Sequence, residues 1–477
     1  MTIPPAAQPG YTAPMSFNAR ILPLVIASAL FMEQMDSTII ATSLPDIAKD
    51  LGTSPVSLKL AFTTYLLGLT VFLPISGWAA DRFGAKTVFR LAIIIFTAGS
   101  VACGFAEGLG WLVAARGLQG VGGALMVPVG RIILLRSVKK SELLDAIAWL
   151  TIPALIGPVI GPPIGGYITT VYDWRWIFWM NLPFGVIALA LASWLMPNLK
   201  AEEPPPLDVR GFLLSGGGLS LSVFGLTVAG RELFSATQVA VMIVVGVALL
   251  VAYVFHARRA AAPILDLRLM RIATYRYSVL GGNLFRIAIG ATPFLLPLML
   301  QLGLGYSAFE SGMVTFASTL GAVLMKFTVA PIVRRFGYRD LLIINGLLCC
   351  LFIALKGAFS ATTPYAVMFG VLLVAGFMRS LQFSSLNTLA YADVEHADMA
   401  KANALYTVMQ QLFIALGVAA AAFILDARLW WSGRSELVTA DFAFALVLTA
   451  AVSAFSVLFY LRLAPGAGAS VSGRGEE

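Results

Sequence analysis

Long apolar runs separated by short polar breaks make up most of this chain. Each run is long enough to cross a bilayer as a helix, which takes ~20 residues. Because the lipid interior offers no partners to backbone amides and carbonyls, such runs are expected to be helical. The pattern predicts an all-α integral membrane protein with fourteen spans, near residues 21–44, 57–79, 88–107, 111–132, 143–171, 176–196, 211–229, 237–256, 277–300, 311–332, 341–360, 364–384, 402–426 and 441–461.

Two polar breaks are longer than the others and divide this pattern. NLKAEEPPPLDVRG follows the sixth run, and HARRAAAPILDLRLMRIATYR follows the eighth. They separate the seventh and eighth runs from a group of six runs on either side. We therefore predict an N-terminal tail at 1–20, a six-helix bundle at 21–196, a linker with two additional helices at 197–272, a second six-helix bundle at 273–463 and a C-terminal tail at 464–477.

The composition supports a membrane protein and excludes several other classes. The chain is 59% hydrophobic and only 12% charged, whereas soluble proteins carry about 25% charged residues. We therefore attribute the net charge of +8 to basic residues in cytoplasmic loops, which orient membrane proteins, and not to a nucleic-acid binding surface. The three cysteines lie in apolar runs at spacings that indicate neither a disulfide framework nor a metal site, and we expect no cofactor.

Basic residues are distributed unevenly between the two sets of loops. If the N-terminus is cytoplasmic, the inner loops hold Arg82, Lys86, Arg90, Arg136, Lys139, Lys140, Lys200, Arg210, Arg258, Arg259, Arg268, Arg271, Arg334, Arg335 and Arg339. The outer loops hold fewer, namely Lys49, Lys59, Arg175, Arg231, Lys356, Arg428 and Arg434. By the positive-inside rule, this bias predicts an inner-membrane protein with both termini in the cytoplasm.

A short internal repeat relates the two groups of six runs. DRFGAK at 81–86 returns as RRFGYR at 334–339, in both cases after the second run of a group. Parallel repeats of this kind build one large class of transporters, with the substrate site between the halves. The second copy has Arg334 where the first has Asp81, so only the first loop can be anchored through an acid.

The first run contains two acids, Glu33 and Asp36, in an otherwise apolar segment. A charge at the bilayer centre costs about 2.5–3.5 kcal/mol on insertion scales, so a functional or structural reason is expected. Their spacing of three places both on one helix face. One interpretation is that they hold and release protons as access alternates, and the other is that ion pairs lock them for packing. Arg116, in the fourth run, likewise needs a partner or a watery cavity.

Two further stretches have compositions that suit segments able to move against their neighbours. In GPVIGPPIGG at 157–166, glycines recur every fourth residue and prolines remove backbone donors, which fits a packing seam or a bent, smooth helix at a rocking interface. We assign Gly157, Pro158, Gly161, Pro162, Gly165 and Gly166 to this helix.

GWAADRFGAKTVFR at 77–90 is either an ordinary basic loop or a gate, for which we select Gly77, Asp81, Arg82, Gly84, Lys86 and Arg90. Trp174, Trp176 and Trp179 in DWRWIFWMNLPFG are expected at the membrane surface.

Together these stretches resemble signature motifs of the major facilitator superfamily. The similarity lies in 77–86, 116–123, 157–166 and the run from Asp36 to Pro45, and it covers essentially the whole chain. The last motif, the span count and DWRWIFWMNLPFG resemble the fourteen-span drug:proton antiporter branch, that is, EmrB/QacA-like multidrug efflux transporters. The resemblance implies alternating access, Asp36 as the first-span acid, Arg116 in proton coupling and the Gly-Pro stripe in antiport. Glu33 is additional to that motif.

Polar residues in the remaining runs suggest where a substrate would bind. The candidates are Arg286, Gln301, Arg379, Gln382, Asn387 and Gln410. The offset between the two RFG loops places Arg286 opposite Glu33, so a pair between them is one expectation. Bases outnumber acids in the runs, which keeps a second function open: export of an endogenous anionic metabolite or metal chelate, such as an organic acid or a siderophore-like compound.

Other functional classes receive less support. Only two histidines occur, His256 at the last position of a run and His396 in a loop, so neither lies in the interior of a membrane run. No GxxxxGK[ST] phosphate loop is present, and together these findings argue against a membrane enzyme and an ATP-driven pump. A non-transporting sensor is a weaker alternative. The expected partners are protons, a small-molecule substrate and the lipid bilayer, with no nucleic acid. The sequence leaves open whether the protein acts as a monomer or with accessory export proteins.

Overall fold

A computed structural model describes residues 17–138, 143–202, 206–229, 234–395, 398–434 and 436–472. Within these ranges, side chains are not described for 17–20, 143–145, 147–148, 151–155, 470 and 472. The basic residues Lys139, Lys140 and Arg231 used in the topology prediction lie outside the described residues, as do His396 and the outermost residues of both predicted tails.

Every predicted run coincides with a helical segment, so the predicted all-α membrane fold is confirmed. Among the described residues, thirteen helical segments are long and apolar enough to span a membrane. The one predicted run outside this set, 143–171, is α7, a helix of 29 residues. The first six spans are α1 (Phe17–Ile39) with η1 (Ile40–Ser43) and α2 (Leu44–Asp50), η2 (Pro55–Leu58) with α3 (Lys59–Phe72), η3 (Leu73–Ile75) and α4 (Ser76–Phe83), α5 (Ala85–Gly104), α6 (Leu109–Ser137), α7 (Leu143–Val171), and α8 (Trp176–Trp179) with α9 (Asn181–Leu195).

The remaining spans continue in the same way. They are α10 (Val209–Val228), α11 (Ala236–Arg259), α12 (Ala273–Leu298) with η6 (Met299–Gly303), α13 (Ala308–Met325), α15 (Tyr338–Lys356), α16 (Tyr365–Tyr391), α17 (Met399–Ser432), and α18 (Thr439–Ala454) with α19 (Val457–Tyr460). Short connecting elements are η5 (Leu267–Arg271), α14 (Val329–Phe336) and α20 (Ala469–Ser472).

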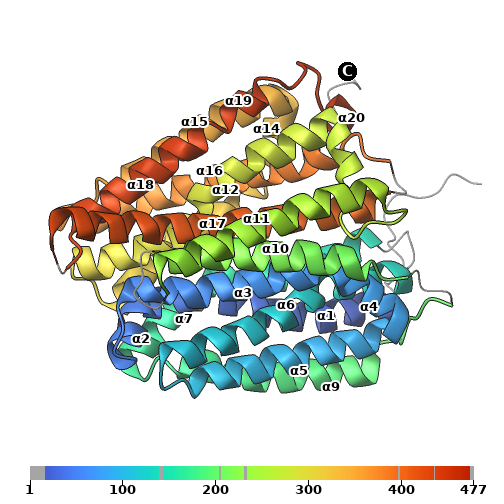
Figure 1. Cartoon of the computed structure of the whole chain (residues 1–477), viewed down its shortest axis with the longest axis horizontal. Coiled ribbons are helices and arrows are strands. Elements are labelled where there is room, and N and C mark those ends of the chain that lie inside the picture. Colours follow the sequence, from blue (N-terminus) through green and yellow to red (C-terminus); the bar gives the residue numbers. More distant parts are fainter. Residues whose placement is uncertain are drawn as a thin grey trace, which may run out of the picture.

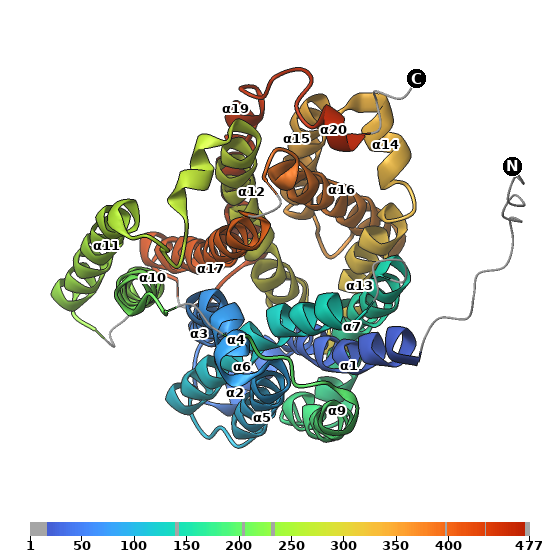
Figure 2. The ribbon, with the colours of Figure 1, turned by 90° about the vertical axis from the view of Figure 1, so that its right-hand side faces the viewer.

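The spans pack as two six-helix bundles with the same internal arrangement (Figures 1 and 2). In the first half α1 packs on α7, α3 on α6, and α5 on both α6 and α9. The second half repeats these contacts with α12 on α17, α13 on α16, and α15 on both α16 and α18. Across the halves, α7 packs on α13 and α17 on α3, which is again a symmetric pair of contacts.

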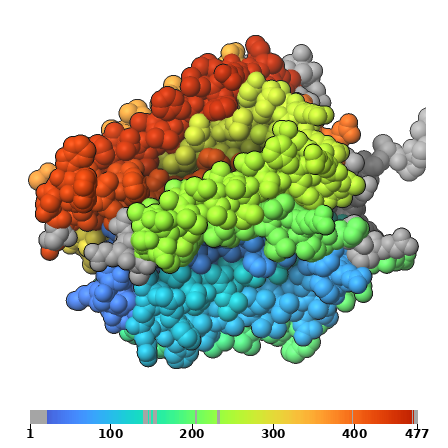
Figure 3. Space-filling model, in the orientation of Figure 1, coloured from blue at the N-terminus to red at the C-terminus, as the bar shows by residue number. Residues whose placement is uncertain are grey.

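The two additional helices lie along one side of this arrangement. Helix α10 packs on α3 of the first half and on α17 of the second, and α11 packs on the outer side of α10. Figure 3 shows α10 and α11 as a band that crosses between the two halves on this face. The carboxylate of Asp208 joins their ends, because it accepts hydrogen bonds from the Gly211 amide and from His256, both at 2.8 Å.

The two RFG loops have the same backbone conformation, which supports their origin as a repeat. Gly84 has φ +93° and precedes α5, and Gly337 has φ +72° and precedes α15. Positive φ is readily adopted only by glycine. The glycine is therefore required at both turns, whereas the acid before it is present only in the first copy.

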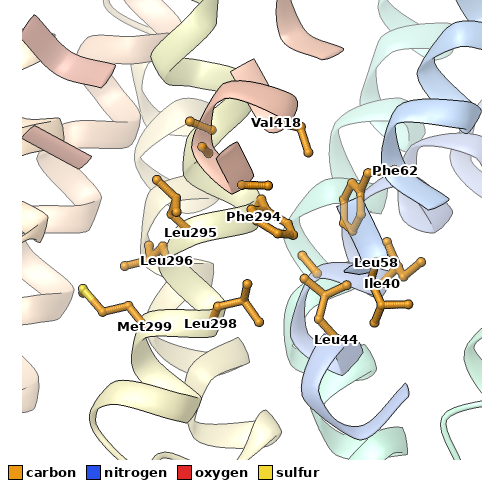
Figure 4. Close-up of a cluster of buried hydrophobic side chains, with 14 of the residues drawn as sticks. Ile40, Leu44, Leu58, Phe62, Phe294, Leu295, Leu296, Leu298, Met299 and Val418 are labelled. Carbon is orange, nitrogen blue, oxygen red and sulfur yellow. The ribbon is translucent and has the colours of Figure 1, made fainter. Parts of the chain in front are cut away.

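The halves meet closely at one end of the molecule, the end that holds α2. There an apolar cluster joins Ile40, Leu44 and Phe62 of the first half to Phe294 and Leu298 of the second (Figure 4). The rings of Phe62 and Phe294 are 6.4 Å apart. In Figure 1 the two groups of helices converge at this end, on the left, and diverge toward α4 and α14 on the right. We call the α2 end the closed end.

One predicted surface position is wrong. Trp174 is only 4% exposed, and its indole nitrogen donates to Asp50 at 3.2 Å while the Arg175 guanidinium lies 4.5 Å from its ring centre. Trp176 is 53% exposed, as expected for an aromatic belt. Hydrophobicity alone does not distinguish the buried Trp174 from the exposed Trp176, because Trp174 is bonded to Asp50, which comes from another part of the chain.

Candidate functional site

An ion pair between α1 and α6 is the centre of the first half. Asp36 and Arg116 are 0% and 1% exposed, and the Asp36 Oδ2 to Arg116 Nη1 distance is 2.6 Å. Asp36 and Arg116, which the family resemblance assigned separately to proton coupling, therefore contact each other directly. Inside a bilayer, neither charge is stable without the other or an equivalent partner.

Neutral amides complete the surroundings of Asp36. Its second oxygen, Oδ1, accepts hydrogen bonds from Gln119 at 2.8 Å and from Asn181 at 2.9 Å. Gln119 in turn accepts from Arg116 at 2.7 Å, and Asn181 also donates to Ser100 at 2.9 Å. Every hydrogen bond between the carboxylate and the described residues thus comes from a donor, which is the arrangement that an ionised acid requires.

Glu33 lies one turn earlier on α1 and has a different environment. It is 5% exposed, and it accepts hydrogen bonds from the Tyr65 hydroxyl at 3.2 Å and from Gln34 at 2.8 Å. Both donors are neutral, and no cation bonds to Glu33 among the described residues. The two acids therefore differ in charge balance: Asp36 is ion-paired, whereas Glu33 is not.

Tyr65 on α3 connects the two acids. Its hydroxyl donates to Glu33, and the Arg116 guanidinium lies 4.3 Å from the centre of its ring. A cation over an aromatic face is attracted by the ring quadrupole. Tyr65 therefore contacts both Glu33 and Arg116, the partner of Asp36. A change in the charge of either acid acts on a residue that also contacts the other acid or its partner.

The glycine stripe of α7 lies against α1, within the same half. A Cβ at Gly157 would meet Phe31 O at 3.0 Å and Met35 N at 3.1 Å, and one at Gly161 would collide with the Thr38 hydroxyl. At Gly165 the nearest atoms belong to Ile39, at 2.6 Å. The stripe thus lets α7 touch the segment of α1 that carries Glu33 and Asp36.

Another side of α7 crosses to the second half. Gly166 lies against the backbone of Ala308, and Gly312 of α13 lies against the backbone of Pro162. The amide of Phe309 donates to the Thr170 hydroxyl at 3.2 Å. Helix α7 therefore contacts both α1 and the opposite half, and it forms a direct connection between the acids and the interface.

Two polar contacts reinforce the closed end. Lys59, which is 0% exposed, pairs with Asp426 of α17 at 2.9 Å. Gln301, predicted to line a substrate cavity, instead donates to Thr42 O across the interface at 2.9 Å. Both contacts must break if the halves are to separate at this end.

The second half holds Arg286 at the position that corresponds to Glu33. Arg286 is 0% exposed and donates to the Tyr406 hydroxyl at 2.5 Å and to Asn283 at 3.2 Å. Its guanidinium also lies over the rings of Phe383 and Tyr406, at 5.1 and 4.7 Å. The predicted pair between Arg286 and Glu33 is not formed in this structure, because each side chain bonds within its own half.

The other cavity candidates fall into two groups. Gln382 is fully buried between α15 and α16, where it accepts from Asn345 at 2.8 Å and donates to Leu342 O at 3.1 Å. Arg379, Asn387 and Gln410 are half-buried, with no hydrogen bond between them and other described residues. Gln382 therefore holds two helices together, and the polar atoms of Arg379, Asn387 and Gln410 have no hydrogen bond to any other residue that the structure describes.

Comparisons with known proteins identify the architecture. The sequence matches the Major Facilitator Superfamily over residues 26–418 and 278–476. The chain belongs to the major facilitator superfamily. It is a multi-pass membrane transport protein and not an enzyme.

Relatives in this superfamily include multidrug resistance proteins. The MdtD multidrug resistance protein of Enterobacter sp. (strain 638) is 36% identical over 408 residues, which cover 86% of each chain. The MdtD protein of Salmonella typhimurium is 37% identical over 408 residues, 86% of this chain and 87% of that one.

Solved structures of major facilitator transporters have the same fold. A D-xylose–proton symporter superposes with a TM-score of 0.68 at 16% identity, over 95% of this chain and 99% of that one. The POT family transporter PepTSo gives 0.70 at 16% identity, over 93% and 97%. The human organic anion transporter MFSD10 gives 0.61 at 14% identity, over 93% and 100%.

The motif loop of this facilitator is anchored as its first copy suggested. Asp81 pairs with Arg136 at the end of α6 at 2.9 Å, and both are partly exposed. Arg82 and Arg90 are exposed and Lys86 is half-buried. Gly77 has open space around it, whereas Gly84 lies against Asn198. Within the part of the chain that the structure describes, Asp81 is the only acidic or basic residue of this loop whose ion pair links two spans.

Sequence reasoning missed several residues of the buried site. Gln119 lies three residues after Arg116 in the 116–123 motif stretch, and Asn181 lies in DWRWIFWMNLPFG. Tyr65 lies in the second run, 57–79, and belongs to none of the motif stretches. The available signal was a polar group inside an apolar run, since such groups need partners in lipid.

Among the described residues, no group of His, Cys, Asp and Glu could hold a metal ion.

Proposed function

We propose that this protein is a proton-coupled antiporter that exports drugs or other small organic molecules by alternating access. The observation that carries the proposal is the buried cluster of Glu33, Asp36 and Arg116, on helices that contact the moving interface through α7. The names of the MdtD relatives support multidrug export. Burial of two acids inside a membrane helix has a high cost, which a proton-binding role explains.

The coupling step follows from the charge balance of the cluster. A proton on Asp36 would cancel the charge that holds Arg116, and the guanidinium would then need another acceptor. Glu33 is the nearest such acid through Tyr65. Protonation would therefore change the position of α1 relative to α6, and α7 would carry that change to α13 through its close backbone contacts.

The conformational state follows from the proposed orientation. With both termini in the cytoplasm of an inner-membrane protein, the closed end faces outward. The apolar cluster, the Lys59–Asp426 pair and the Gln301 contact then seal the outer side. The Asp81–Arg136 pair lies at the cytoplasmic end. We propose that 21–196 and 273–463 move as the two rocking bundles.

A second candidate function is export of an endogenous anion. It is favoured by the buried Arg286, which has only neutral partners, Tyr406 and Asn283, among the described residues. In the first half, by contrast, the buried Arg116 is neutralised by an ion pair with Asp36. A substrate with a negative group would supply the charge that the second half lacks.

The experiment is proton-coupled transport by the purified protein in proteoliposomes. An imposed pH gradient should drive movement of a fluorescent cationic drug, and drug addition should dissipate the gradient. Asp36→Asn should abolish both effects, and Glu33→Gln should reduce them. Coupled transport by Asp36→Asn at the wild-type rate would refute the role of Asp36, and drug movement without any proton movement would refute antiport.

A further inference from the structure

Each RFG loop is covered by the segment that leaves the sixth span of its own half. In the first half the segment after α9 reaches the loop, and the Leu199 carbonyl accepts from the Ala85 amide at 2.8 Å. The Ala201 amide donates to Asp81 O at 3.2 Å. In the second half the segment after α19, residues 461–472, reaches the second RFG loop. We call this segment the C-terminal strap.

Polar contacts tie the C-terminal strap to the start of α15. The Arg339 guanidinium donates to Leu461 O at 3.4 Å, and the Tyr338 hydroxyl donates to Val471 O at 3.5 Å. Helix α20, at the end of the strap, packs on α14. Figure 2 shows the strap running from α19 to α20, which lies beside α14. Both sides of the second RFG loop are therefore in contact with the strap.

An apolar contact supports these bonds. Tyr338 and Leu463 are each 4% exposed and share one buried cluster with Leu389 of α16. Gly468 is buried with φ +74°, and a Cβ there would lie 2.7 Å from the Tyr338 ring and 2.9 Å from the Leu389 side chain. Positive φ is readily adopted only by glycine. The strap thus requires a glycine where its backbone lies against Tyr338.

The two copies of the hexapeptide differ at the positions that anchor the loop. Asp81 of the first copy pairs with Arg136 of α6 at 2.9 Å, whereas the second copy has Arg334 at this position. Ala85 of the first copy corresponds to Tyr338 of the second, which is the residue that the strap covers. The second loop therefore exchanges an acidic anchor for an aromatic one, and the aromatic anchor needs the strap.

All partners of the strap belong to the second half. Through Tyr338, Leu389 and Leu463 it joins the start of α15 to α16 and to the chain after α19. We propose that the C-terminal strap fixes the second RFG loop to its own half, so that 273–463 rocks as one body. This inference rests on the proposed alternating access. It gives the segment that the sequence indicated as a cytoplasmic tail a mechanical role.

Hydrogen–deuterium exchange of the purified full-length protein tests the contact directly. Gly468→Ala places a methyl group against Tyr338, and Tyr338→Ala removes the ring. In both variants the amides of 334–341 should exchange about tenfold faster or more, because lost buried contacts lower the cost of local opening. The amides of 81–88 should be unchanged. Proton-driven drug transport in proteoliposomes should fall several-fold in the same variants.

Matched controls lie in the same segment. Gly466→Ala changes a strap glycine that has open space around it and no positive φ, so it should leave both exchange and transport unchanged. Tyr338→Phe keeps the ring and loses only a long hydrogen bond of 3.5 Å, so its exchange should stay close to that of the wild type. If Tyr338→Ala fails to fold, Leu463→Ala removes the apolar contact from the strap side.

Three results would overturn the proposal. Unchanged exchange of 334–341 in Gly468→Ala and Tyr338→Ala would show that the strap does not hold the loop. Faster exchange throughout all spans would reduce the contact to general packing. Faster exchange of the loop with wild-type transport would show that rocking does not need the strap. A wild type without proton-driven transport would refute the antiport proposal instead, because the exchange experiment does not depend on transport.

Discussion

Substitution of Asp36 by asparagine tests the central ion pair in a way that separates stability from coupling. Asp36→Asn hardly changes side-chain volume, but it leaves the Arg116 guanidinium buried without a counter-charge. Removing one partner of a buried pair costs about 3–5 kcal/mol, and both side chains here are at most 1% exposed. Asparagine also has only one acceptor oxygen, whereas Asp36 accepts from Arg116, Gln119 and Asn181.

Removing both charges should relieve most of this cost. In Asp36→Asn/Arg116→Gln, the asparagine oxygen can accept from Gln119 and Asn181, and its amide can donate to the new glutamine. We expect the double variant to lie within about 1–2 kcal/mol of the wild type, because neutral replacements of buried pairs are often tolerated. The coupling energy of the double-mutant cycle should then be at least about 2 kcal/mol.

The assay is reversible unfolding of the four proteins in detergent, together with proton-coupled transport in proteoliposomes. Both single variants and the double variant should lack coupling, although the double variant is nearly as stable as the wild type. Additive destabilisation in the cycle would refute the pair as a coupled unit. Wild-type stability of Asp36→Asn would show that Arg116 is compensated elsewhere.

The remaining predictions concern the interface and the loops. Gly161→Leu should abolish transport with normal membrane insertion, because its Cβ would collide with the Thr38 hydroxyl; Gly370→Leu, at an open position of α16, is the control, and equal transport by both would remove the stripe from the mechanism. Lys59→Gln should make the closed end more accessible to thiol reagents, through loss of the Asp426 pair, and unchanged labelling would contradict its role as a latch. Gly84→Ala should destabilise the protein by about 1 kcal/mol or more, since φ is +93° there, and unfolding measurements that show no loss would contradict this. Cysteine labelling should place residues 86 and 477 on the same side of the membrane, and labelling from opposite sides would break the proposed topology.

The class of the protein and the positions of its spans were predictable from the sequence, because both depend on local properties. A bilayer selects apolar runs of helical length wherever they occur, so hydropathy located every span, α7 included. The RFG repeat and the motif stretches also lie in contiguous sequence, and they were sufficient to indicate the superfamily. The same reasoning marked Glu33, Asp36 and Arg116 as costly inside lipid, although it left open how each is compensated.

Which side chains meet was decided by the tertiary structure. The ion pair joins residues 80 positions apart in sequence, and Asn181 comes to Asp36 from 145 positions away. The glycine stripe was expected either as a packing seam or at a rocking interface. Its three regularly spaced members pack on α1, and a different side of α7 crosses to α13. Helical periodicity shows which residues share a face, but it does not show which neighbour that face meets. That choice depends on how helices remote in sequence pack together, and it is the physical reason why Asp36 is paired with Arg116 while Glu33 and Arg286 remain in separate halves.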